Sequence, residues 1–405
     1  MKQRKKLLLL GGSSQQVVAI KTAKRLGYET VLCDYLPDNP GQYHADKFYQ
    51  TSTTDLEAVL AIAIREKIDG IIAYASDPAA PTAAYVAEKL GLPTHPYQSV
   101  RILCNKDLFR RFLAESGMNA PQACGYTSKE EALKELDRFA LPVIVKPVDS
   151  SGSKGVTVLH SWERVAEALD FAFSFSRGGR VIVEEFIEKK HPYLIGGDIF
   201  VVDGRIVLWG LLNCHRDPAA NPLVPVGKSY PPELEPQDLA AVKHTLQEMV
   251  DKLNIRMGAM NVELMVDAKG KVWPIDVGPR NGGNMIPDLL GYIFGVDVVE
   301  MSVSTAMGEP ILPEIGEGTA CYATHNLHAR ESGSYEQIDF DSELEQYIIR
   351  KCLYKQRGDK VEFFDNAAKA LGIIFLKFDT QEQMQSILGS IHDAYKVVVT
   401  QEHNG

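Results

Sequence analysis

The sequence predicts an α/β fold in its first hundred or so residues and α+β folds after them. Between Lys6 and Cys104, apolar strand-like runs alternate with segments of helical periodicity. Strands that alternate with helices form a parallel sheet with crossover helices. From Asn105 onward, neighbouring strand-like runs joined by polar or glycine-containing turns indicate hairpins. We therefore expect a Rossmann-like parallel-sheet domain followed by mixed α+β domains.

Length and composition narrow the class of protein. A chain of 405 residues exceeds what one hydrophobic core supports, so we expect several domains. The net charge of -10 argues against a nucleic-acid partner, which needs a clustered basic surface. No apolar run approaches the roughly 20 residues of a membrane span, and the run from Leu7 to Leu10 is too short for a signal peptide. The six scattered cysteines suggest neither disulfides nor zinc, so we expect a cytoplasmic protein without a membrane partner.

The first domain is predicted to alternate three strands with three helices. The strands are expected at residues 7–10, 30–34 and 70–74, and the helices at residues 15–26, 53–66 and 78–90. The turn Gly11-Gly12-Ser13 after the first strand invites a dinucleotide-binding interpretation, which Asp34 about 20 residues further on would support. Gln16 stands where the third glycine belongs, so we interpret the turn as a structural crossover.

Two lysines and a loop rich in glycine and serine mark the next stretch. Asn105 is predicted to cap a helix whose first turn holds Lys106, which opposes the helix macrodipole unless an anion lies nearby. Lys146 ends a strand predicted at residues 141–146, and the loop from Asp149 to Gly155 follows it. Small residues in such a loop leave N–H groups and hydroxyls free to cover a polyphosphate. A solvated lysine and a plain hairpin loop are the alternatives, because the loop lacks Walker spacing.

The remaining elements are predicted from the same hydrophobic periodicities, one typical of helices and one typical of strands. Helices are expected at residues 129–139, 162–175, 237–253, 286–307 and 381–394, and strands at residues 156–159, 180–187, 198–202, 205–212, 322–327, 361–364 and 372–378. The proline-punctuated stretch from Cys214 to Pro232 is predicted to be a long loop that carries His215 and Arg216. His325 and His328 have no third metal ligand near them in sequence, so we interpret them as ordinary strand residues.

An acidic hairpin is predicted at residues 259–278. A polar turn of two or four residues would place Glu263 opposite Pro274, with Asp276 two residues further along the same face. Two anions on a mostly apolar face attract a hard divalent cation, and an edge hairpin with two solvated acids is the alternative. Arg280 follows in a glycine-rich bend, where a guanidinium can hold a phosphate or carboxylate at two points.

In this order, the motifs resemble the ATP-grasp superfamily of carboxylate–amine ligases, of the carbamoyl-phosphate-synthase and L-amino-acid-ligase kind. The similarity spans roughly residues 5–310. It implies a Rossmann-like domain at residues 1–104 and an ATP-grasp domain at residues 105–310. The small lobe of that domain would cover about residues 120–185, and an α+β substrate or interaction region would fill residues 311–405.

The resemblance also implies roles for the residues that match family motifs. The residues expected to contact ATP are Lys106, Lys146, Ser150, Ser151, Gly152, Ser153, Gly155, Glu184, Glu185, Phe186, Ile187 and Glu188. The lysines and the loop would bind the phosphates, the segment 184–187 adenine, and Glu188 the ribose. Those expected to bind Mg²⁺, with Mn²⁺ as an alternative, are Glu263 and Asp276. Arg280 and Lys146 would act on the transferred phosphoryl group, and the residues expected to meet the substrates are Arg280, Asn281, Gly282, His215 and Arg216.

Three positions depart from the family pattern. Asp276 stands where relatives usually have glutamate, and Gly278 stands where a metal-binding asparagine is usual. The family's Glu-Gly-x-Glu continuation after the adenine segment is replaced by Glu188-Lys189-Lys190-His191. We therefore expect a first magnesium ion, whereas the ligands of a second are incomplete.

The reaction implied by the resemblance joins two small molecules. A carboxylate, such as that of an amino acid, would attack the γ-phosphate of Mg-ATP to give an acyl phosphate and ADP, and an amine would then form the amide. A phosphotransferase acting on a non-carboxylate acceptor and a non-catalytic nucleotide-binding protein are the alternatives. His215 is a candidate general base by position alone, so we leave that role open. The resemblance also leaves a homodimer open.

Overall fold

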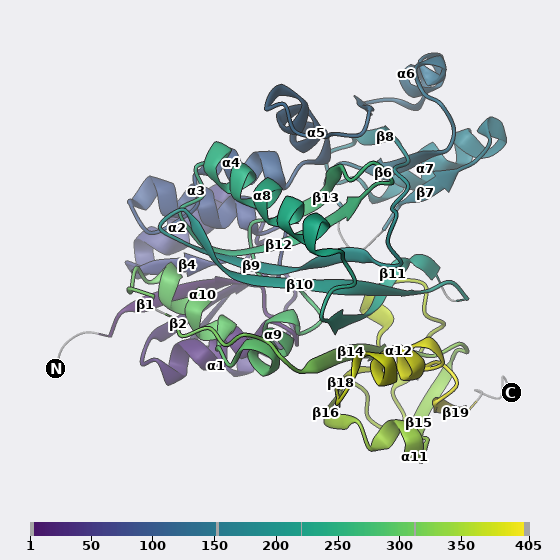
Figure 1. Ribbon diagram of the computed structural model, residues 1–405. Coiled ribbons are helices and arrows are strands. Elements are labelled where there is room, and N and C mark those ends of the chain that lie inside the picture. Colours follow the sequence, from purple (N-terminus) through teal and green to yellow (C-terminus); the bar gives the residue numbers. More distant parts are fainter. Residues whose placement is uncertain (1–3, 151–153, 220, 312, 401–405) are drawn as a thin grey trace, which may run out of the picture.

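The computed structural model describes residues 4–150, 154–219, 221–311 and 313–400. In Figure 1 the N-terminal elements lie at one end of a central sheet, and a small lobe and the C-terminal elements lie at the other. A parallel sheet near the N-terminus is followed by antiparallel sheets. The predicted combination of α/β and α+β architecture is therefore confirmed.

The N-terminal sheet has four parallel strands in the order β3-β2-β1-β4. These strands are β1 (Lys6–Leu10), β2 (Glu29–Asp34), β3 (Lys47–Gln50) and β4 (Gly70–Ile72). The helices of this region are α1 (Val17–Arg25), α2 (Leu56–Glu66), α3 (Ala80–Leu90) and α4 (Tyr97–Leu103). Neither β3 nor α4 was predicted, because β3 is a short edge strand with polar ends and α4 has only seven residues.

Side chains of the domain itself close the crossover turn after β1. The amide of Gln16 donates hydrogen bonds to the carbonyls of Leu10 at 3.2 Å and Tyr74 at 2.9 Å. The carboxylate of Asp34 accepts a hydrogen bond from the backbone N–H of Gly12 at 2.7 Å. A dinucleotide would need the Gly12 N–H and the Asp34 carboxylate, and these two groups bind each other. This contact agrees with a structural crossover.

The small lobe is a four-stranded antiparallel sheet in the order β5-β8-β6-β7. Its strands are β5 (Ala123–Tyr126), β6 (Val143–Pro147), β7 (Thr157–Leu159) and β8 (Val181–Glu185). The helices here are α5 (Lys106–Glu115), α6 (Lys129–Lys134) and α7 (Val165–Phe175). The side chain of Asn105 accepts a hydrogen bond from the N–H of Leu108 at 3.3 Å, which confirms the predicted cap of α5.

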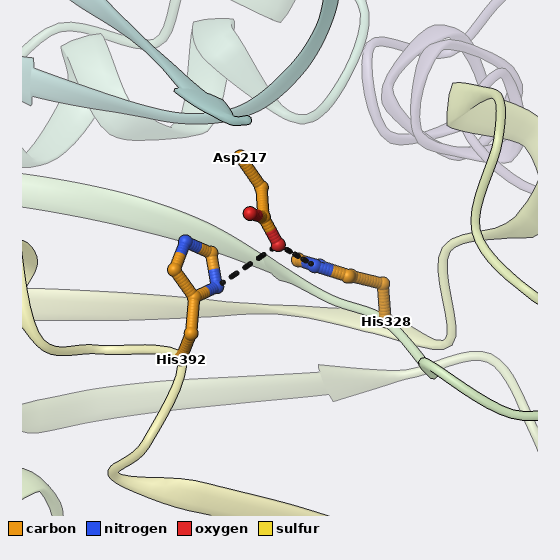
Figure 2. A group of neighbouring side chains, drawn as sticks. All are labelled: Asp217, His328 and His392. Atoms are coloured by element: carbon orange, nitrogen blue, oxygen red, sulfur yellow. Dashed lines mark hydrogen bonds and ion pairs between the residues drawn. The ribbon is translucent and has the colours of Figure 1, made fainter. Parts of the chain in front are cut away.

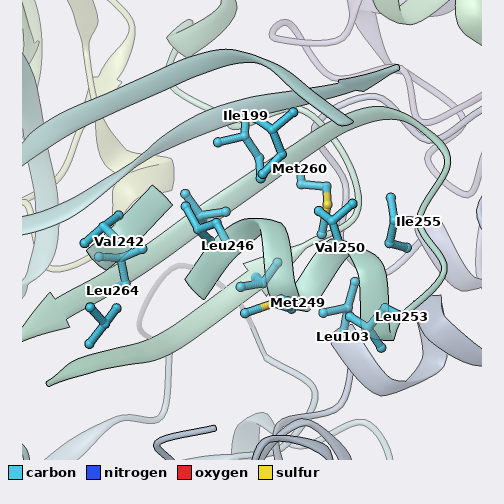
Figure 3. Packing of buried hydrophobic residues seen from close by; sticks show 14 of the residues in the cluster. Leu103, Ile199, Val242, Leu246, Met249, Val250, Leu253, Ile255, Met260 and Leu264 are labelled. Atoms are coloured by element: carbon cyan, nitrogen blue, oxygen red, sulfur yellow. The ribbon is translucent and has the colours of Figure 1, made fainter. Parts of the chain in front are cut away.

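The central sheet has eight strands in the order β13-β12-β9-β10-β11-β14-β18-β16. Its strands are β9 (Leu194–Val202), β10 (Arg205–Asp217), β11 (Asn221–Tyr230), β12 (Met257–Val266), β13 (Val272–Gly278), β14 (Cys321–Leu327), β16 (Ile348–Leu353) and β18 (Gly372–Phe378). Helix α8 (Pro236–Lys252) packs on one face. Its residues Val242, Leu246 and Val250 recur every four positions and contact the cluster that contains Met260 and Leu264 of β12 (Figure 3).

The predicted loop between Cys214 and Pro232 is wrong, because most of this stretch forms the β10–β11 hairpin. Val224 and Val226 of β11 are only 1% and 2% exposed. Pro225 lies opposite Arg216 where the register of the two strands shifts. Proline lacks a donor for the ladder but is tolerated at such irregularities, so the prolines do not prevent a strand here.

The central sheet crosses the predicted domain boundary at residue 310, since β11 pairs with β14. The C-terminal region adds a three-stranded sheet of β15 (Gly333–Phe340), β17 (Lys360–Val361) and β19 (Tyr395–Thr400), with helices α11 (Ser342–Glu345) and α12 (Gln381–Gly389). Short 3₁₀ helices occupy Pro40–Tyr43, Leu136–Arg138, Trp162–Arg164 and Ala367–Lys369.

The single helix predicted at residues 286–307 is wrong, because two helices lie there. Helix α9 (Ile286–Phe294) ends at Gly295, whose φ of +70° closes it, and α10 (Val298–Ala306) begins after it. Among the described residues, no single helix is long and apolar enough to cross a membrane. The α9 and α10 pair passes that test only when the two are joined, and it is bent by 114°.

Candidate functional site

The two acidic residues predicted to bind a metal lie directly opposite each other. Glu263 of β12 pairs with Asp276 of β13, so both side chains share one face of the hairpin, as predicted. The predicted register is wrong, because Pro274 lies opposite Leu264. The turn contains five residues, and a bulge gives β13 one extra residue between Pro274 and Asp276. The bulge therefore converts a diagonal pair of carboxylates into a facing pair.

Basic side chains from distant segments converge on this acid pair. The ammonium of Lys106 lies 3.5 Å from the Asp276 carboxylate and donates a hydrogen bond to the carbonyl of Ser150 at 2.9 Å. Burial alone would raise the pKa of Asp276, but nearby positive charges lower it. These charges belong to Lys106, Lys146, Arg110 and Arg280. The positive charges around Asp276 are therefore already in place to stabilise an anion, or a metal cation whose other ligands are anions.

Lys146 is held in a buried cluster with Glu184 and Arg110. The Lys146 ammonium contacts the Glu184 carboxylate, which Arg110 also contacts through its Nε at 2.9 Å. Burial would raise the pKa of Glu184, but Arg110 and Lys146 bring it to about 2. Sequence reasoning missed Arg110; its one signal is the spacing of four from Lys106, which places both on one face of α5. The side chain of Glu184 therefore positions Lys146.

Nucleotide binding is expected to weaken as the pH rises from about 7 to about 9. Burial, with Arg110 and Lys106, lowers the pKa of Lys146 to about 8 although Glu184 opposes the shift. The protonated amine binds phosphate, so above this pKa binding must take up a proton, and affinity falls by up to about tenfold per pH unit. Calorimetric titration with Mg-ADP across this range measures the slope.

The control for this pH dependence is Lys146→Arg, whose guanidinium stays charged throughout the range. Its affinity should change less with pH than that of the wild-type protein. A wild-type affinity that stays constant over the same range would contradict a lowered Lys146 pKa.

Arg280 is fixed by a carboxylate from the N-terminal domain. Its Nε donates to Asp77 at 2.7 Å, its Nη2 donates to the second carboxylate oxygen, and its Nη1 donates to the carbonyl of Asn281 at 2.9 Å. Burial would lower the pKa of Arg280, but Asp77 raises it. Asp77 follows β4 and carried no motif, so sequence reasoning missed it. Because all three nitrogens of the guanidinium donate hydrogen bonds within the protein, its orientation is set before any ligand binds.

Gly278 has a packing reason that explains its departure from the family pattern. A Cβ atom at this position would lie 2.5 Å from the Oδ1 of Asp77 and 3.1 Å from the Cζ of Arg280. A side chain such as asparagine therefore cannot replace Gly278 while the Asp77–Arg280 pair stays in place. Position 278 therefore offers no side chain to the acid pair of Glu263 and Asp276.

Gly278→Ala is expected to destabilise the protein by about 1–3 kcal/mol, the usual cost of adding a methyl group to a tightly packed site. The methyl group would push against the Asp77 carboxylate. Thermal unfolding of the variant measures the loss. Gly389→Ala is the matched control, because a Cβ atom there meets nothing within 4 Å. Equal stability of the two variants would contradict this account of Gly278.

The turn after Arg280 is anchored by a buried carboxylate. Gly282 donates its backbone N–H to both oxygens of Asp198, at 2.9 and 2.8 Å, and Asn261 donates to one of them at 2.9 Å. Burial raises the pKa of Asp198 to about 6, although the Gly282 N–H and Asn261 lower it. Asn281 is 2% exposed, and among the described residues its Nδ2 has no hydrogen-bond partner. Asp198 was also missed from the sequence, where it read as a strand residue.

His215 and Arg216 lie on β10 and not on a loop. The ring of His215 packs on Tyr193, with centroids 4.4 Å apart, and its Nε2 lies 2.8 Å from the Ser229 hydroxyl. Burial, with Lys228 and Arg216, lowers the pKa of His215 to about 4, so this imidazole is neutral near pH 7. Arg216 approaches Glu263 at 3.6 Å. The structure therefore brings Arg216 to the acid pair and leaves His215 a weak base.

The predicted phosphate loop is described only at its two ends. Ser151, Gly152 and Ser153 lie outside the described residues. The hydroxyl of Ser150 donates a hydrogen bond to the carbonyl of Lys154 at 3.0 Å. Gly155 has a φ of +74°, and a Cβ atom there would lie 2.8 Å from Pro147, so only glycine fits.

The predicted adenine segment follows β8. Glu185 donates its N–H to the carbonyl of Gln122 at 2.8 Å, and Phe186 donates to the carbonyl of Pro142 at 3.2 Å. In the part of the chain that the structure describes, the N–H of Ile187 has no such partner. Glu188 is exposed. The segment thus has one backbone donor available after β8.

A cavity of about 120 Å³ adjoins the turn after Arg280. Its walls come from three distant segments, including Gln15, Gly282 and Tyr354. Gln15 also accepts a hydrogen bond from the N–H of Asn284 at 2.8 Å. The N-terminal domain, the central sheet and the C-terminal region therefore meet beside the site.

Similarity to known proteins shows the family of this chain. A family described as "ATP-grasp domain" matches residues 139–288. A formate-dependent phosphoribosylglycinamide formyltransferase of Methanocaldococcus jannaschii is 30% identical over 286 residues, which make up 68% of this chain and 69% of that protein. The chain belongs to the ATP-grasp family. The resemblance inferred from the sequence is confirmed.

Other relatives of this ATP-grasp protein extend the comparison. The C-terminal section of a carbamoyl phosphate synthase large chain from Aquifex aeolicus is 26% identical over 309 residues, covering 74% of this chain and 56% of that protein. The crystal structure of an L-amino acid ligase from Bacillus licheniformis has the same fold, with a TM-score of 0.82, 20% identity, and coverage of 99% of this chain and 100% of that one.

The ATP-grasp protein is an ATP-dependent carbon–nitrogen ligase. Solved structures of the same fold contain ADP or MgADP. The residues present fit the metal, since the facing pair of Glu263 and Asp276 offers the hard oxygen donors that Mg²⁺ prefers.

Proposed function

We propose that this ATP-grasp ligase joins a small carboxylate, such as an amino acid, to an amine through an acyl phosphate, with ATP cleaved to ADP. The observation that carries the proposal is the convergence of Lys106, Lys146 and Arg280 on Asp276, opposite Glu263. These groups come from four separate segments of the chain, and their charges match those of a magnesium nucleotide.

The chemistry explains why such a field is needed. A carboxylate is a poor electrophile, and its oxygen is a poor leaving group, so direct attack by an amine fails. Phosphorylation by ATP corrects both defects, and the protein has to place the reactants and neutralise the transferring phosphoryl group. Lys106 and Lys146 would bind phosphate oxygens, and Arg280 would stabilise the group in transfer. Magnesium held by Glu263 and Asp276 would offset further phosphate charge.

The nucleotide would extend from this field to the segment after β8. Adenine would meet the segment from Glu184 to Ile187, and the free N–H of Ile187 is a suitable donor for it. Glu188 would contact the ribose. Ser150 and Gly155, with the loop between them, would close over the phosphates.

The part of the site that the nucleotide leaves free would hold the carboxylate and the amine. Two polar groups are within reach of a small substrate: Arg216 near Glu263, and the Nδ2 of Asn281, which has no hydrogen-bond partner in the described part of the chain. The cavity lined by Gln15, Gly282 and Tyr354 would distinguish one substrate from another. A small enclosed cavity agrees with metabolites of amino-acid size. A homodimer and a cytoplasmic location remain predictions.

The experiment that tests the proposal is a matrix of amino acids and other small carboxylates against candidate amines. ADP and phosphate release are followed with Mg-ATP present, and the product is identified by mass spectrometry. The ligase predicts ADP formation that requires both substrates and an amide product. A stable phosphorylated product from one acceptor would instead select a phosphotransferase, and nucleotide binding without ADP release would refute catalysis.

A further inference from the structure

A buried cluster of two histidines and one aspartate lies outside the set of residues assigned to the nucleotide site. Figure 2 shows Asp217, at the end of β10, between His328, just after β14, and His392, in the turn after α12. One ligand atom from each residue lies within 4.8 Å of those of the other two. Asp217 and His328 are only 1% and 3% exposed. No role in nucleotide chemistry accounts for this group.

The ring of His328 is oriented by a backbone contact. Its Nδ1 lies 2.7 Å from the carbonyl oxygen of Asn326, and because a carbonyl only accepts hydrogen bonds, this nitrogen carries the proton. The other ring nitrogen, Nε2, faces the Asp217 carboxylate at 3.1 Å. In a neutral imidazole that nitrogen presents a lone pair. Such an arrangement, with the outer nitrogen held by a carbonyl, is typical of metal-bound histidines.

The ring of His392 presents a second nitrogen to the same carboxylate. Its Nδ1 lies 3.5 Å from the Asp217 Oδ2 atom. This nitrogen is buried, and among the described residues it has no hydrogen-bond partner.

The distances agree with a tetrahedral metal site. Nitrogen and oxygen ligands about 2.0–2.1 Å from a tetrahedral zinc ion lie roughly 3.3 Å from each other. The two nitrogen-to-oxygen distances in the cluster are 3.1 and 3.5 Å. His392 lies in a turn, so its ring can approach His328 without moving a strand.

We propose that Asp217, His328 and His392 bind a divalent transition-metal cation, with Zn²⁺ as the ion that the donor set favours. Two imidazoles and one carboxylate suit zinc, whereas the carboxylates of Glu263 and Asp276 suit magnesium. A cavity of about 220 Å³, lined in part by His328 and His392, leaves the fourth position open to a water ligand.

The surrounding groups leave room for a cation. Arg330 lies 3.9 Å from the Asp217 carboxylate, but its side chain is 52% exposed and can turn to solvent. The ring centroid of His325 lies within 5.6 Å of those of both ligand rings, in tilted and edge-to-face contacts. Its Nε2 lies 3.3 Å from the Tyr395 hydroxyl. Charging several of these clustered imidazoles would be opposed by their mutual repulsion, whereas one metal ion uses their neutral lone pairs.

The metal would link the three segments that carry Asp217, His328 and His392. Asp217 follows Arg216, which approaches Glu263, so the site would tie this end of β10 to the C-terminal region. We assign it a structural role that holds the β10–β11 hairpin in place. This inference rests on the cluster alone and stands independently of the proposed reaction.

The test uses the full chain without a histidine tag, stripped with a chelator. Zinc is titrated against a chromophoric chelator with excess Mg²⁺ present to occupy carboxylate sites, and Co²⁺ is titrated to record the visible spectrum. We expect one zinc ion per chain, a higher unfolding temperature with zinc, and the intense absorption of tetrahedral cobalt. His392→Ala and Asp217→Asn should each weaken zinc binding at least about tenfold.

The matched control is His244→Ala, which removes an exposed histidine of α8. It should bind zinc as the wild type does. Equal zinc affinity in the wild type, His392→Ala and Asp217→Asn would overturn the proposal, and so would a wild-type chain that binds no zinc or gives only the weak spectrum of octahedral cobalt. If a variant fails to fold, the zinc stoichiometry and the cobalt spectrum of the wild-type chain still test whether it holds one tetrahedral metal site, and the other variant tests whether the cluster is that site.

Discussion

Replacing Lys146 with alanine is expected to reduce turnover on the order of 100-fold, the usual cost of losing one preorganised charge at a reacting group. Its ammonium is buried beside Glu184 and contributes to the field at Asp276. Water that fills the vacated space would reorganise during the reaction and stabilise the phosphoryl group less well. Initial rates of ADP release, measured with the substrate pair found in the matrix, give the loss.

The control separates lost charge from lost structure. Lys134→Ala removes an exposed lysine of the same lobe and should keep wild-type turnover. Glu184 keeps Arg110 as a partner when Lys146 is removed, so the variant should still fold. Lys146→Met fills the same space without charge, and near-wild-type turnover of a folded Lys146→Met protein would refute the role given to Lys146.

Replacing Arg280 with alanine is expected to reduce turnover by a similar factor, about 100-fold. The two-point contact with Asp77 fixes the guanidinium before ATP binds. Arg280→Lys should fall between the two proteins, because a lysine restores the charge but not the planar fork. Comparing the turnover number at saturating ATP for the three proteins measures the effect.

Asp77→Asn tests the positioning of Arg280 separately. The amide accepts at one oxygen only, so Arg280 should lose part of its orientation and turnover should fall less than in Arg280→Ala. Arg164→Ala, which alters a side chain 78% exposed, is the matched control. If Arg280→Ala turned over like this control, Arg280 would have no part in the chemistry.

Hydrophobic periodicity made much of the fold predictable. The long helix α8 has apolar residues at helical spacing, and β1 is a short apolar run that ends at a glycine turn. The hairpin of β10 and β11 was not recognised, because its prolines resemble those of a loop and residue types do not show that β11 pairs with both β10 and β14. The break between α9 and α10 rests on the left-handed backbone of Gly295, which periodicity does not record.

Site residues that lie in sequence motifs could be predicted. Site residues that act only through a contact with a distant segment could not. Lys106, Glu263 and Asp276 were found because their type and order match a family. Their arrangement depended on a bulge and a five-residue turn, which no pattern of residue types shows. Asp77 and Asp198 were missed because each acts through a contact with a segment far away in sequence. Such pairs become visible only in three dimensions.

The Asp77–Arg280 pair limits how this chain can be recombined with other ATP-grasp proteins. Its members stand 203 positions apart, and Gly278 must remain small for them to meet. A chimaera could take its first domain from one parent and its nucleotide lobe from another. Asp77 and Arg280 would then come from different parents, and their contact would form only if both residues were chosen to match. Hybrid ligases built on this scaffold therefore have to carry Asp77, Gly278 and Arg280 from the same parent.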